Sequence, residues 1–147
     1  MESGRSFNEA TFLLLIWENA MGALLQTAMI IDDDPDLGEL LAIFLEKRKI
    51  YSLIVPTLSE AAGYLGYMKP TVIFLDNSFP DGLGVNFIRD IRSADHDIKI
   101  IMITGDSATW IREKAIEEGI DYFICKPFNL ALIDALLDRM NFRKDSP

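Results

Sequence analysis

The stretch Ala28-Met29-Ile30-Ile31-Asp32-Asp33-Asp34-Pro35 joins an apolar run to three consecutive carboxylates and a proline. The apolar run predicts a buried strand, and the proline suits the first turn of a helix. Carboxylates about 4 Å apart repel by roughly 4 kcal/mol at a protein-surface dielectric, so a fold keeps them together only when they are solvated, share protons or hold a cation. The triplet alone fits two alternatives: a solvated loop that caps the next helix, or a site for Mg²⁺ or Ca²⁺.

The composition of the 147 residues is that of one globular domain, because half of them are apolar and a quarter are charged. A formal net charge of −9 argues against a basic surface that binds nucleic acid. The single cysteine, Cys125, suits a reducing compartment and hence a cytoplasmic location. Its place in an apolar run predicts a buried, inert thiol.

Short apolar runs alternate with amphipathic stretches from residue 28 onward. The runs lie at 29–31, 51–55, 71–75, 98–103 and 122–125. They are apolar throughout, which is typical of parallel strands covered on both faces. Apolar residues recur at helical spacing around 37–45, 61–68, 85–91, 110–116 and 130–140. Five strand–helix units in this order predict a doubly wound α/β sandwich over residues 28–141, followed by a short tail, 142–147.

Residues 1–27 stand outside this repeat. Ser6-x-x-Glu9 is a capping-box pattern, and the apolar residues behind it lie on one face at helical spacing: Leu13, Ile16, Trp17, Ala20 and Leu24. Three interpretations stay open: an extra amphipathic helix, a tail ahead of the true start, or a membrane or export segment. Glu18 and Asn19 argue against a membrane span. A helix here predicts a contact with its own domain, a second copy or a partner.

Four of the five predicted strands end in polar residues of complementary chemistry. The first strand leads into Asp32 and Asp33, the third into Asp76, the fourth into Thr104 and the fifth into Lys126. In open parallel sheets, ligands bind outside the carboxyl ends of the strands, where the strand order reverses. Strand order 2-1-3-4-5 places this crevice between the first and third strands and gathers the three carboxylates. Such a set suits a hard divalent ion and a carboxylate oxygen that attacks phosphorus, aided by a lysine charge and a threonine hydroxyl.

The stretches that carry these residues resemble the receiver domain of two-component response regulators. The matching motifs are Ile30-Ile31-Asp32-Asp33-Asp34-Pro35, Leu75-Asp76-Asn77-Ser78-Phe79-Pro80-Asp81-Gly82-Leu83-Gly84, Ile103-Thr104-Gly105 and Cys125-Lys126-Pro127-Phe128. The resemblance covers about residues 28–141. It implies a flavodoxin-like fold, a five-stranded parallel sheet of order 2-1-3-4-5 with helices on both faces, to which this chain adds an N-terminal helix.

The resemblance implies a signalling switch and not an enzyme with a separate substrate. Asp76 would take a phosphoryl group from a sensor histidine kinase or a histidine phosphotransfer protein, and would slowly lose it again. Mg²⁺ would be held directly by Asp33, Asp76 and the backbone carbonyl of Ser78, with Asp32 acting largely through water. Thr104 and Lys126 would contact the phosphoryl oxygens, and Thr104 would act with Phe123 as the conformational switch.

The resemblance also implies an output surface on the fourth helix, fifth strand and fifth helix, about residues 107–139. We expect an unidentified output protein there and neither nucleic acid nor a membrane; a homodimer would use this surface or the N-terminal helix. Phe123 replaces the frequent tyrosine, so its switching would depend on packing. Ser78 and Asp106 occupy positions that tune the phosphate lifetime, and Asp106 either orients an attacking water or faces solvent. Asn77 has no assigned role.

Two other functions are weighed against this one. Asp32-x-Asp34 after a strand, with a later threonine and lysine, superficially fits an aspartate-based phosphohydrolase of the haloacid dehalogenase type, but that scheme leaves Asp76 without a role. A phosphate-independent receiver fold would serve only for interaction, against which the complete acidic set argues. Taken singly, Thr104 also fits a helix cap, Lys126 a neutralising charge and Phe123 a core residue.

Overall fold

The computed structural model describes residues 8–11, 13, 26–106 and 108–142. One parallel sheet is built from β1 (Gln26–Ile31), β2 (Ile50–Val55), β3 (Val72–Leu75), β6 (Lys99–Thr104) and β7 (Tyr122–Cys125). Its strand order is β2-β1-β3-β6-β7. The predicted order 2-1-3-4-5 is therefore confirmed.

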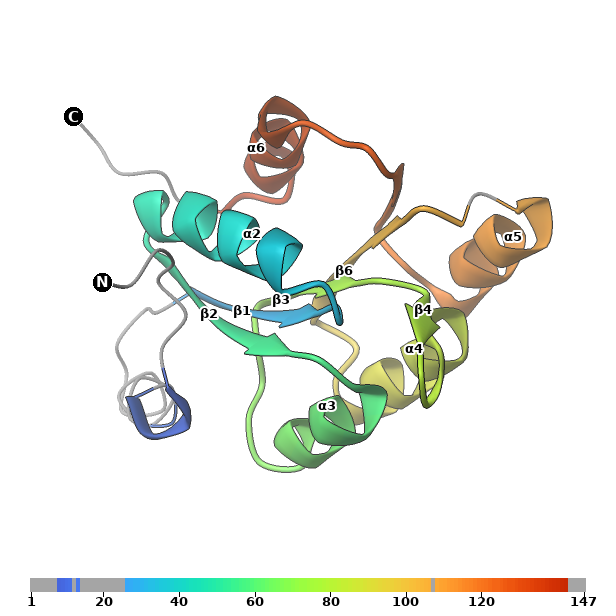
Figure 1. Cartoon of the computed structure of the whole chain (residues 1–147), viewed down its shortest axis with the longest axis horizontal. Helices are drawn as coiled ribbons and strands as arrows, with labels where there is room; N and C mark the ends of the chain where they lie inside the picture. Colours follow the sequence, from blue (N-terminus) through green and yellow to red (C-terminus); the bar gives the residue numbers. More distant parts are fainter. Residues whose placement is uncertain (1–7, 12, 14–25, 107, 143–147) are drawn as a thin grey trace.

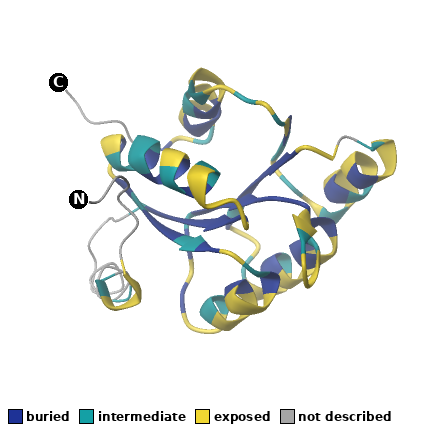
Figure 2. Ribbon diagram, viewed as in Figure 1, coloured by how far each residue is buried: buried dark blue, intermediate teal, exposed yellow. Residues whose placement is uncertain are grey.

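Helices cover both faces of the sheet (Figure 1). The helices are α2 (Pro35–Lys47), α3 (Leu58–Leu65), α4 (Gly84–Ala94), α5 (Thr109–Glu118) and α6 (Leu130–Arg139). The first and last of these share one hydrophobic core with one face of the strands, whereas α3, α4 and α5 share a second core with the other face. Figure 2 shows the central strands buried between these layers. The burial of β1 and β3 on both faces explains why β3 and residues 28–31 of β1 are apolar throughout.

The acidic triplet ends β1 and starts α2. Asp34 is the N-cap of α2, and its side chain accepts hydrogen bonds from the backbone N–H groups of Asp36 and Leu37. Pro35 is the first residue of the helix, where the absence of an N–H has no cost. The capping interpretation thus holds for Asp34, whereas the other two carboxylates have different surroundings.

The segment after β3 forms a small antiparallel hairpin that the sequence pattern did not indicate. Its strands are β4 (Ser78–Phe79) and β5 (Gly82–Leu83). Gly82 has φ 149°, a backbone conformation that residues other than glycine rarely adopt. The hairpin leads directly into α4 and so joins the edge of the sheet to the second helical layer (Figure 1).

The prediction of a buried cysteine is wrong, because Cys125 is exposed. It is the last residue of β7, which lies at the edge of the sheet next to β6. Only Ile124 of that strand is fully buried. An apolar run at a sheet edge therefore does not bury every side chain.

The N-terminal prediction is only partly covered by the described residues. Residues 9–11 and 13 are helical, and the Asn8 side chain accepts a hydrogen bond from the backbone N–H of Thr11 at 2.8 Å. The predicted cap Ser6 and the apolar residues 16, 17, 20 and 24 lie outside the described residues. β1 begins at Gln26, earlier than the expected strand start at residue 29. Among the described residues, no helix has the length and apolar character needed to cross a membrane.

Candidate functional site

The carboxyl ends of four strands meet at one edge of the sheet. Ile31 of β1 pairs with Leu75 of β3, so the residues that follow them, Asp32 and Asp76, leave the sheet side by side. On the other side of β3, the last residue of β6 is Thr104. Its backbone oxygen accepts a hydrogen bond from the N–H of Lys126 at 2.8 Å. The fold therefore brings together the residues that the sequence placed after separate strands.

Three carboxylates form an acidic cluster at this edge. Asp32, Asp33 and Asp76 each offer an oxygen, and these oxygens all lie within 4.8 Å of one another. Asp32 is 4% exposed and Asp76 is 8% exposed, whereas Asp33 is exposed. Two of the three charges are thus held away from bulk water, and Asp33 opens the cluster to solvent.

Lys126 supplies a positive charge to the cluster. Its Nζ lies 3.2 Å from Asp32 Oδ2 and 3.4 Å from Asp76 Oδ2. Burial lowers the pKa of Lys126, but the charges of the two carboxylates outweigh that effect and hold its pKa above the ordinary value. The ammonium therefore stays protonated and bridges the ends of β1 and β3.

Asp32 experiences opposing influences. Burial raises its pKa most, the N–H of Asp34 that donates to its Oδ1 lowers it, the charge of Asp76 raises it, and Lys126 lowers it. The net result is a pKa above the ordinary value. One lysine does not neutralise three neighbouring carboxylates, so the cluster has an excess of negative charge for a cation to offset.

The loop after Asp76 is fixed by contacts that the sequence pattern did not reveal. Asn77 is fully buried, and its side-chain oxygen accepts the N–H of Val85 at 2.9 Å. Its backbone oxygen accepts the N–H of Gly84 at 2.7 Å. A Cβ on Gly84 would lie 1.9 Å from the backbone oxygen of Asp76, so only glycine fits there. Asn77 thus has a structural role beside Asp76, and the glycine of the matched motif was the sequence signal for this close approach.

The two predicted switch residues come from neighbouring strands, Thr104 from the end of β6 and Phe123 from β7. Thr104 is 1% exposed, and its Oγ1 accepts the N–H of Asp106 at 3.1 Å. The helix α5 starts after Ala108, which makes no side-chain cap, so Thr104 is not a cap of that helix. Phe123 is partly buried and packs on the core of the second layer. The guanidinium of Arg112 lies over its ring, 5.4 Å from the centroid, a contact that no sequence signal indicated.

The two predicted tuning residues are both exposed. Ser78 lies in β4, two residues after Asp76. The Asp106 carboxylate accepts the N–H of Ala108 at 3.3 Å, which holds it in the turn before α5. Both remain accessible to solvent at the rim of the acidic cluster.

The residues at this edge fit a hard divalent cation. All the clustered ligands are carboxylate oxygens, the donor type that Mg²⁺ and Ca²⁺ prefer, and the exposed Asp33 provides access. Soft ligands are absent from the described cluster, because the exposed thiol of Cys125 is not among its members. Asp32, Asp33 and Asp76 would hold such a cation, and Lys126 adds a second positive charge at the Asp76 carboxylate.

The sequence profile of the response regulator receiver domain matches residues 28–138. The chain belongs to this family. A receiver domain is the phosphoacceptor signalling module of two-component systems, and receiver domains interact with kinases and output domains. The predicted family and fold are therefore confirmed.

Curated relatives and solved structures agree with this assignment. The chain is 28% identical over 128 residues to the DNA-binding response regulator MtrA of Mycolicibacterium smegmatis, covering 86% of this chain and 56% of MtrA. It is 30% identical over 115 residues to the transcriptional regulatory protein CitB of Klebsiella pneumoniae, covering 77% of this chain and 49% of CitB. The beryllofluoride-activated NtrC4 receiver domain dimer is 32% identical with a TM-score of 0.72, covering 79% and 95% of the two chains. The chain spans about half the length of the curated relatives it matches.

Proposed function

We propose that Asp76 is the phosphoacceptor of this receiver domain and that a sensor histidine kinase or histidine phosphotransfer protein is its donor. The observation that carries the proposal is the position of its carboxylate, 3.4 Å from Lys126 Nζ and within 4.8 Å of the Asp32 and Asp33 oxygens. A carboxylate oxygen of Asp76 attacks the donor phosphorus. A new P–O bond forms while the P–N bond to the donor histidine breaks, and the imidazole nitrogen takes up a proton.

The residues around Asp76 divide the work of binding. Asp33, Asp76 and the backbone carbonyl of Ser78 would hold Mg²⁺, and Asp32 would act on it through water. The ion, when bound, offsets the negative charge of the phosphoryl oxygens. Lys126 contributes a second positive charge from the opposite side, and its raised pKa keeps that charge in place. The excess of negative charge in the cluster supports this assignment.

The switch would start from Thr104. Its hydroxyl turns toward a phosphoryl oxygen and donates a hydrogen bond to it. Such a turn changes the contact with the Asp106 N–H, which now reaches Thr104 Oγ1 at 3.1 Å, and frees space that Phe123 fills. Phe123 has no hydroxyl, so its response depends on packing against the second layer.

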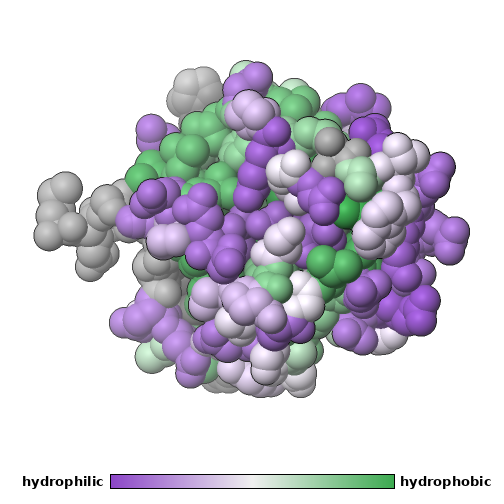
Figure 3. Space-filling model, turned by 45° about the vertical axis from the view of Figure 1, so that its right-hand side comes forward, coloured by the Kyte–Doolittle hydropathy of each residue, from purple (hydrophilic) through white to green (hydrophobic). Residues whose placement is uncertain are grey.

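The output surface would be formed by α5, β7 and α6. Three large apolar side chains are exposed on its helices: Trp110 and Ile116 of α5, and Leu132 of α6, at 54%, 58% and 41%. Apolar atoms appear as separate patches within largely hydrophilic surface in Figure 3. An output protein or a second copy would bind here, and a dimer of the NtrC4 receiver domain is known. We expect no direct contact of this domain with nucleic acid or a membrane, and a cytoplasmic location.

The phosphate lifetime would depend on Ser78 and Asp106. Both are exposed at the rim of the cluster, where water approaches Asp76. The Asp106 carboxylate accepts the Ala108 N–H, which supports a fixed orientation in which it also contacts an attacking water. The only activities of the domain itself would then be self-phosphorylation and slow loss of the phosphate.

The alternative of a haloacid dehalogenase-type hydrolase has less support. That scheme needs Asp34 as a second catalytic carboxylate, but its side chain is engaged in capping α2. It also leaves unexplained why Asp76 shares the lysine with Asp32. A phosphate-independent interaction module stays a second candidate, and unchanged partner binding by Asp76→Asn under phosphorylating conditions would favour it.

Addition of Mg²⁺ and beryllofluoride, a mimic of an acyl phosphate, tests the assignment. We expect NMR shifts at Asp76, Thr104 and Lys126 in the natural sequence and none in Asp76→Asn. The matched control is Asp34→Asn, which removes a neighbouring carboxylate and retains an oxygen that caps α2. Equal responses of the natural sequence and Asp76→Asn would contradict the proposal.

A further inference from the structure

The β4–β5 hairpin connects the acidic cluster to α3. At its base, Ser78 follows two residues after Asp76 and contributes the backbone carbonyl proposed to hold the cation. At its tip, Asp81 lies against the start of α3. The hairpin pairs only Ser78 with Leu83 and Phe79 with Gly82. Ser78 at its base and Asp81 at its tip are thus joined by only two residues, Phe79 and Pro80.

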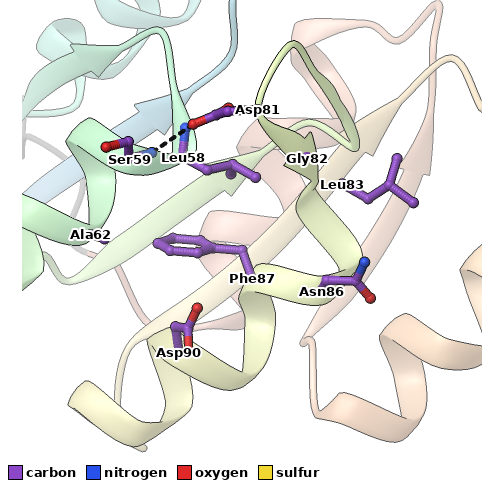
Figure 4. A pocket seen from close by; sticks show the side chains of 9 residues that line it. All are labelled: Leu58, Ser59, Ala62, Asp81, Gly82, Leu83, Asn86, Phe87 and Asp90. Atoms are coloured by element: carbon purple, nitrogen blue, oxygen red, sulfur yellow. Dashed lines mark hydrogen bonds between the residues drawn. The ribbon is translucent and has the colours of Figure 1, made fainter.

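Asp81 binds the first turn of α3 from another part of the chain. Its Oδ1 accepts the N–H of Leu58 at 3.4 Å and its Oδ2 accepts the N–H of Ser59 at 3.0 Å (Figure 4). The N–H of Glu60 donates to the Thr57 side chain at 3.1 Å. Three of the N–H groups that the start of the helix leaves without internal partners are thereby satisfied, two of them by the hairpin. The negative charge also lies at the positive end of the helix dipole.

The helix α3 is held weakly by the rest of the domain. It has eight residues, of which only Leu58 and Ala61 are buried. Gly63 lowers its helix propensity, and a side chain there would meet nothing within 4 Å. A cleft of about 460 Å³ is lined by α3, the hairpin and α4, and the side chains of Leu58 and Phe87 point into it (Figure 4).

The far end of α3 contacts the N-terminal segment. The hydroxyl of Tyr64, in the last turn of α3, donates a hydrogen bond to the carboxylate of Glu9. That bond, together with some burial, raises the pKa of Tyr64 to about 12. Glu9, Glu60, Gly63, Tyr64 and Tyr67 line a cleft of about 250 Å³. Within the described stretch 8–11, Glu9 therefore lies against the helix that the hairpin caps.

We propose that the hairpin, Asp81 and α3 form a relay that couples occupancy of Asp76 to the contact between Glu9 and Tyr64. The inference rests on the proposed function of Asp76. Asp81 is a positioning residue in this relay, since it touches neither cation nor phosphoryl group. The N-terminal segment becomes a second output element, distinct from the α5–β7–α6 surface. Coupling of this kind is reciprocal, so the Glu9 contact must also change the affinity at Asp76.

NMR of the full chain with Mg²⁺ and beryllofluoride tests the relay. Shifts at Thr104 and Lys126 report occupancy, and shifts at Glu9 and Tyr64 report the relay. We expect both sets in the natural sequence. Occupancy shifts without relay shifts would overturn the relay alone, whereas the loss of both sets would overturn the proposed function with it.

Variants at the hairpin tip separate coupling from folding. Asp81→Ala should keep the occupancy shifts and lose those at Glu9, and Asp81→Asn, which retains one acceptor oxygen, should restore part of them. Hydrogen exchange at the Glu60 amide, capped by Thr57, shows whether α3 stays folded. Asp90→Ala is the matched control, because Asp90 is an exposed carboxylate on the same cleft. A relay response in Asp81→Ala equal to that of Asp90→Ala would overturn the relay.

The reciprocal test uses Glu9→Gln. If occupancy weakens the Glu9–Tyr64 contact, Glu9→Gln tightens beryllofluoride binding, and if occupancy strengthens the contact, it loosens binding. A change of about fivefold or more is expected for a coupling of ordinary size. Tyr64→Phe, which removes the same hydrogen bond from the other side, should change the affinity in the same direction. Unchanged affinity in both variants would overturn the relay.

Discussion

The two helical layers of this receiver domain differ in the arginine contacts that hold their helices together. In the first layer, Arg48 at the end of α2 is 5% exposed and binds Asp134 and Asp138 of α6. It also donates to the backbone oxygen of Phe142 at 3.1 Å. In the second layer, the clamp is the more exposed Arg92, which donates to the backbone oxygen of Gly119 at the C-terminal end of α5.

The difference shows where the domain can move. Arg48 fixes α6 against α2 along much of its length, because Asp134 and Asp138 are one turn apart. Arg92 grips α5 at only one end, and the opposite end, after Ala108, has no side-chain cap and lies close to Thr104 in sequence. Both α3 and α5 bury only two residues. The helices of the first layer are thus held together more firmly, and the second layer contains the elements suited to respond to phosphorylation.

The largest effect is expected from removing Arg48, which holds α6 against α2. Arg48→Met should lower the free energy of unfolding by about 3 kcal/mol, because it removes a charged hydrogen bond to the buried backbone oxygen of Phe142 together with the ion pairs to Asp134 and Asp138. Urea denaturation measures the loss. The matched variant Arg89→Met removes a solvent-screened surface pair with Glu118 and should change the stability far less than Arg48→Met does. Equal losses in the two variants would mean that the layers do not differ.

The next effect concerns the point where the second layer joins the site. In Gly84→Ala, the added carbon would lie 1.9 Å from the backbone oxygen of Asp76, so the loop must shift. We expect a loss of about 1–3 kcal/mol in stability, as for other overpacked sites, together with weaker beryllofluoride binding. Gly63→Ala is the control, since a side chain there meets no atom within 4 Å, and it should be neutral or stabilising. Normal beryllofluoride binding by Gly84→Ala would separate the loop from the site.

The grouping of most of the candidate site could be predicted because each residue lies at or directly after the end of a strand. Asp32, Asp76, Thr104 and Lys126 are placed by local sequence, and the parallel topology brings strand ends to one edge. The exposure of Cys125 could also have been derived, because the predicted strand order already put its strand at an edge.

The hydrogen bonds and ion pairs between helices could not be predicted, because they join residues far apart in the chain. The partners of Arg48 lie 86 to 94 positions away, and Asp81 caps a helix 22 positions before it. A single sequence shows such residues only as surface charges. Asn77 is similar, since its role depends on a hydrogen bond to Val85 that no periodicity reveals.

A smaller effect is expected from the charge of Asp32. Burial holds the pKa of Asp32 in the folded state above its ordinary value. Ionisation of Asp32 therefore lowers the stability of the fold. The contribution of the neutral form is complete below the pKa of the unfolded state and is lost as the pH rises through the pKa of the folded state. Without Mg²⁺, Asp32→Asn should therefore be more stable than the natural sequence at neutral pH. The difference should shrink on acidification. Thermal melts from neutral pH down to the ordinary pKa of an aspartate measure this difference in stability, with Asp34→Asn as the control. A difference that stays constant across that range would contradict a raised pKa at Asp32.

The smallest effect should come from Arg112. Its cation–π contact with Phe123 is on the surface and contributes about 0.5–1 kcal/mol. Arg112→Gln should lose that amount, whereas Arg112→Lys should keep most of it. A double-mutant cycle with Phe123→Leu isolates the contact. A coupling free energy between Arg112 and Phe123 as large as the stability loss in Arg48→Met would mean that α5 is held as firmly as α6.

The most direct test of the central claim is the position of the acyl phosphate. The full chain is incubated with acetyl phosphate and Mg²⁺, the acyl phosphate is trapped by reduction with borohydride, and the peptides are mapped by mass spectrometry. We predict a single modified residue, Asp76, and no modification in Asp76→Asn. Modification of Asp32, or equal incorporation by Asp76→Asn, would contradict the assignment of Asp76 as the phosphoacceptor.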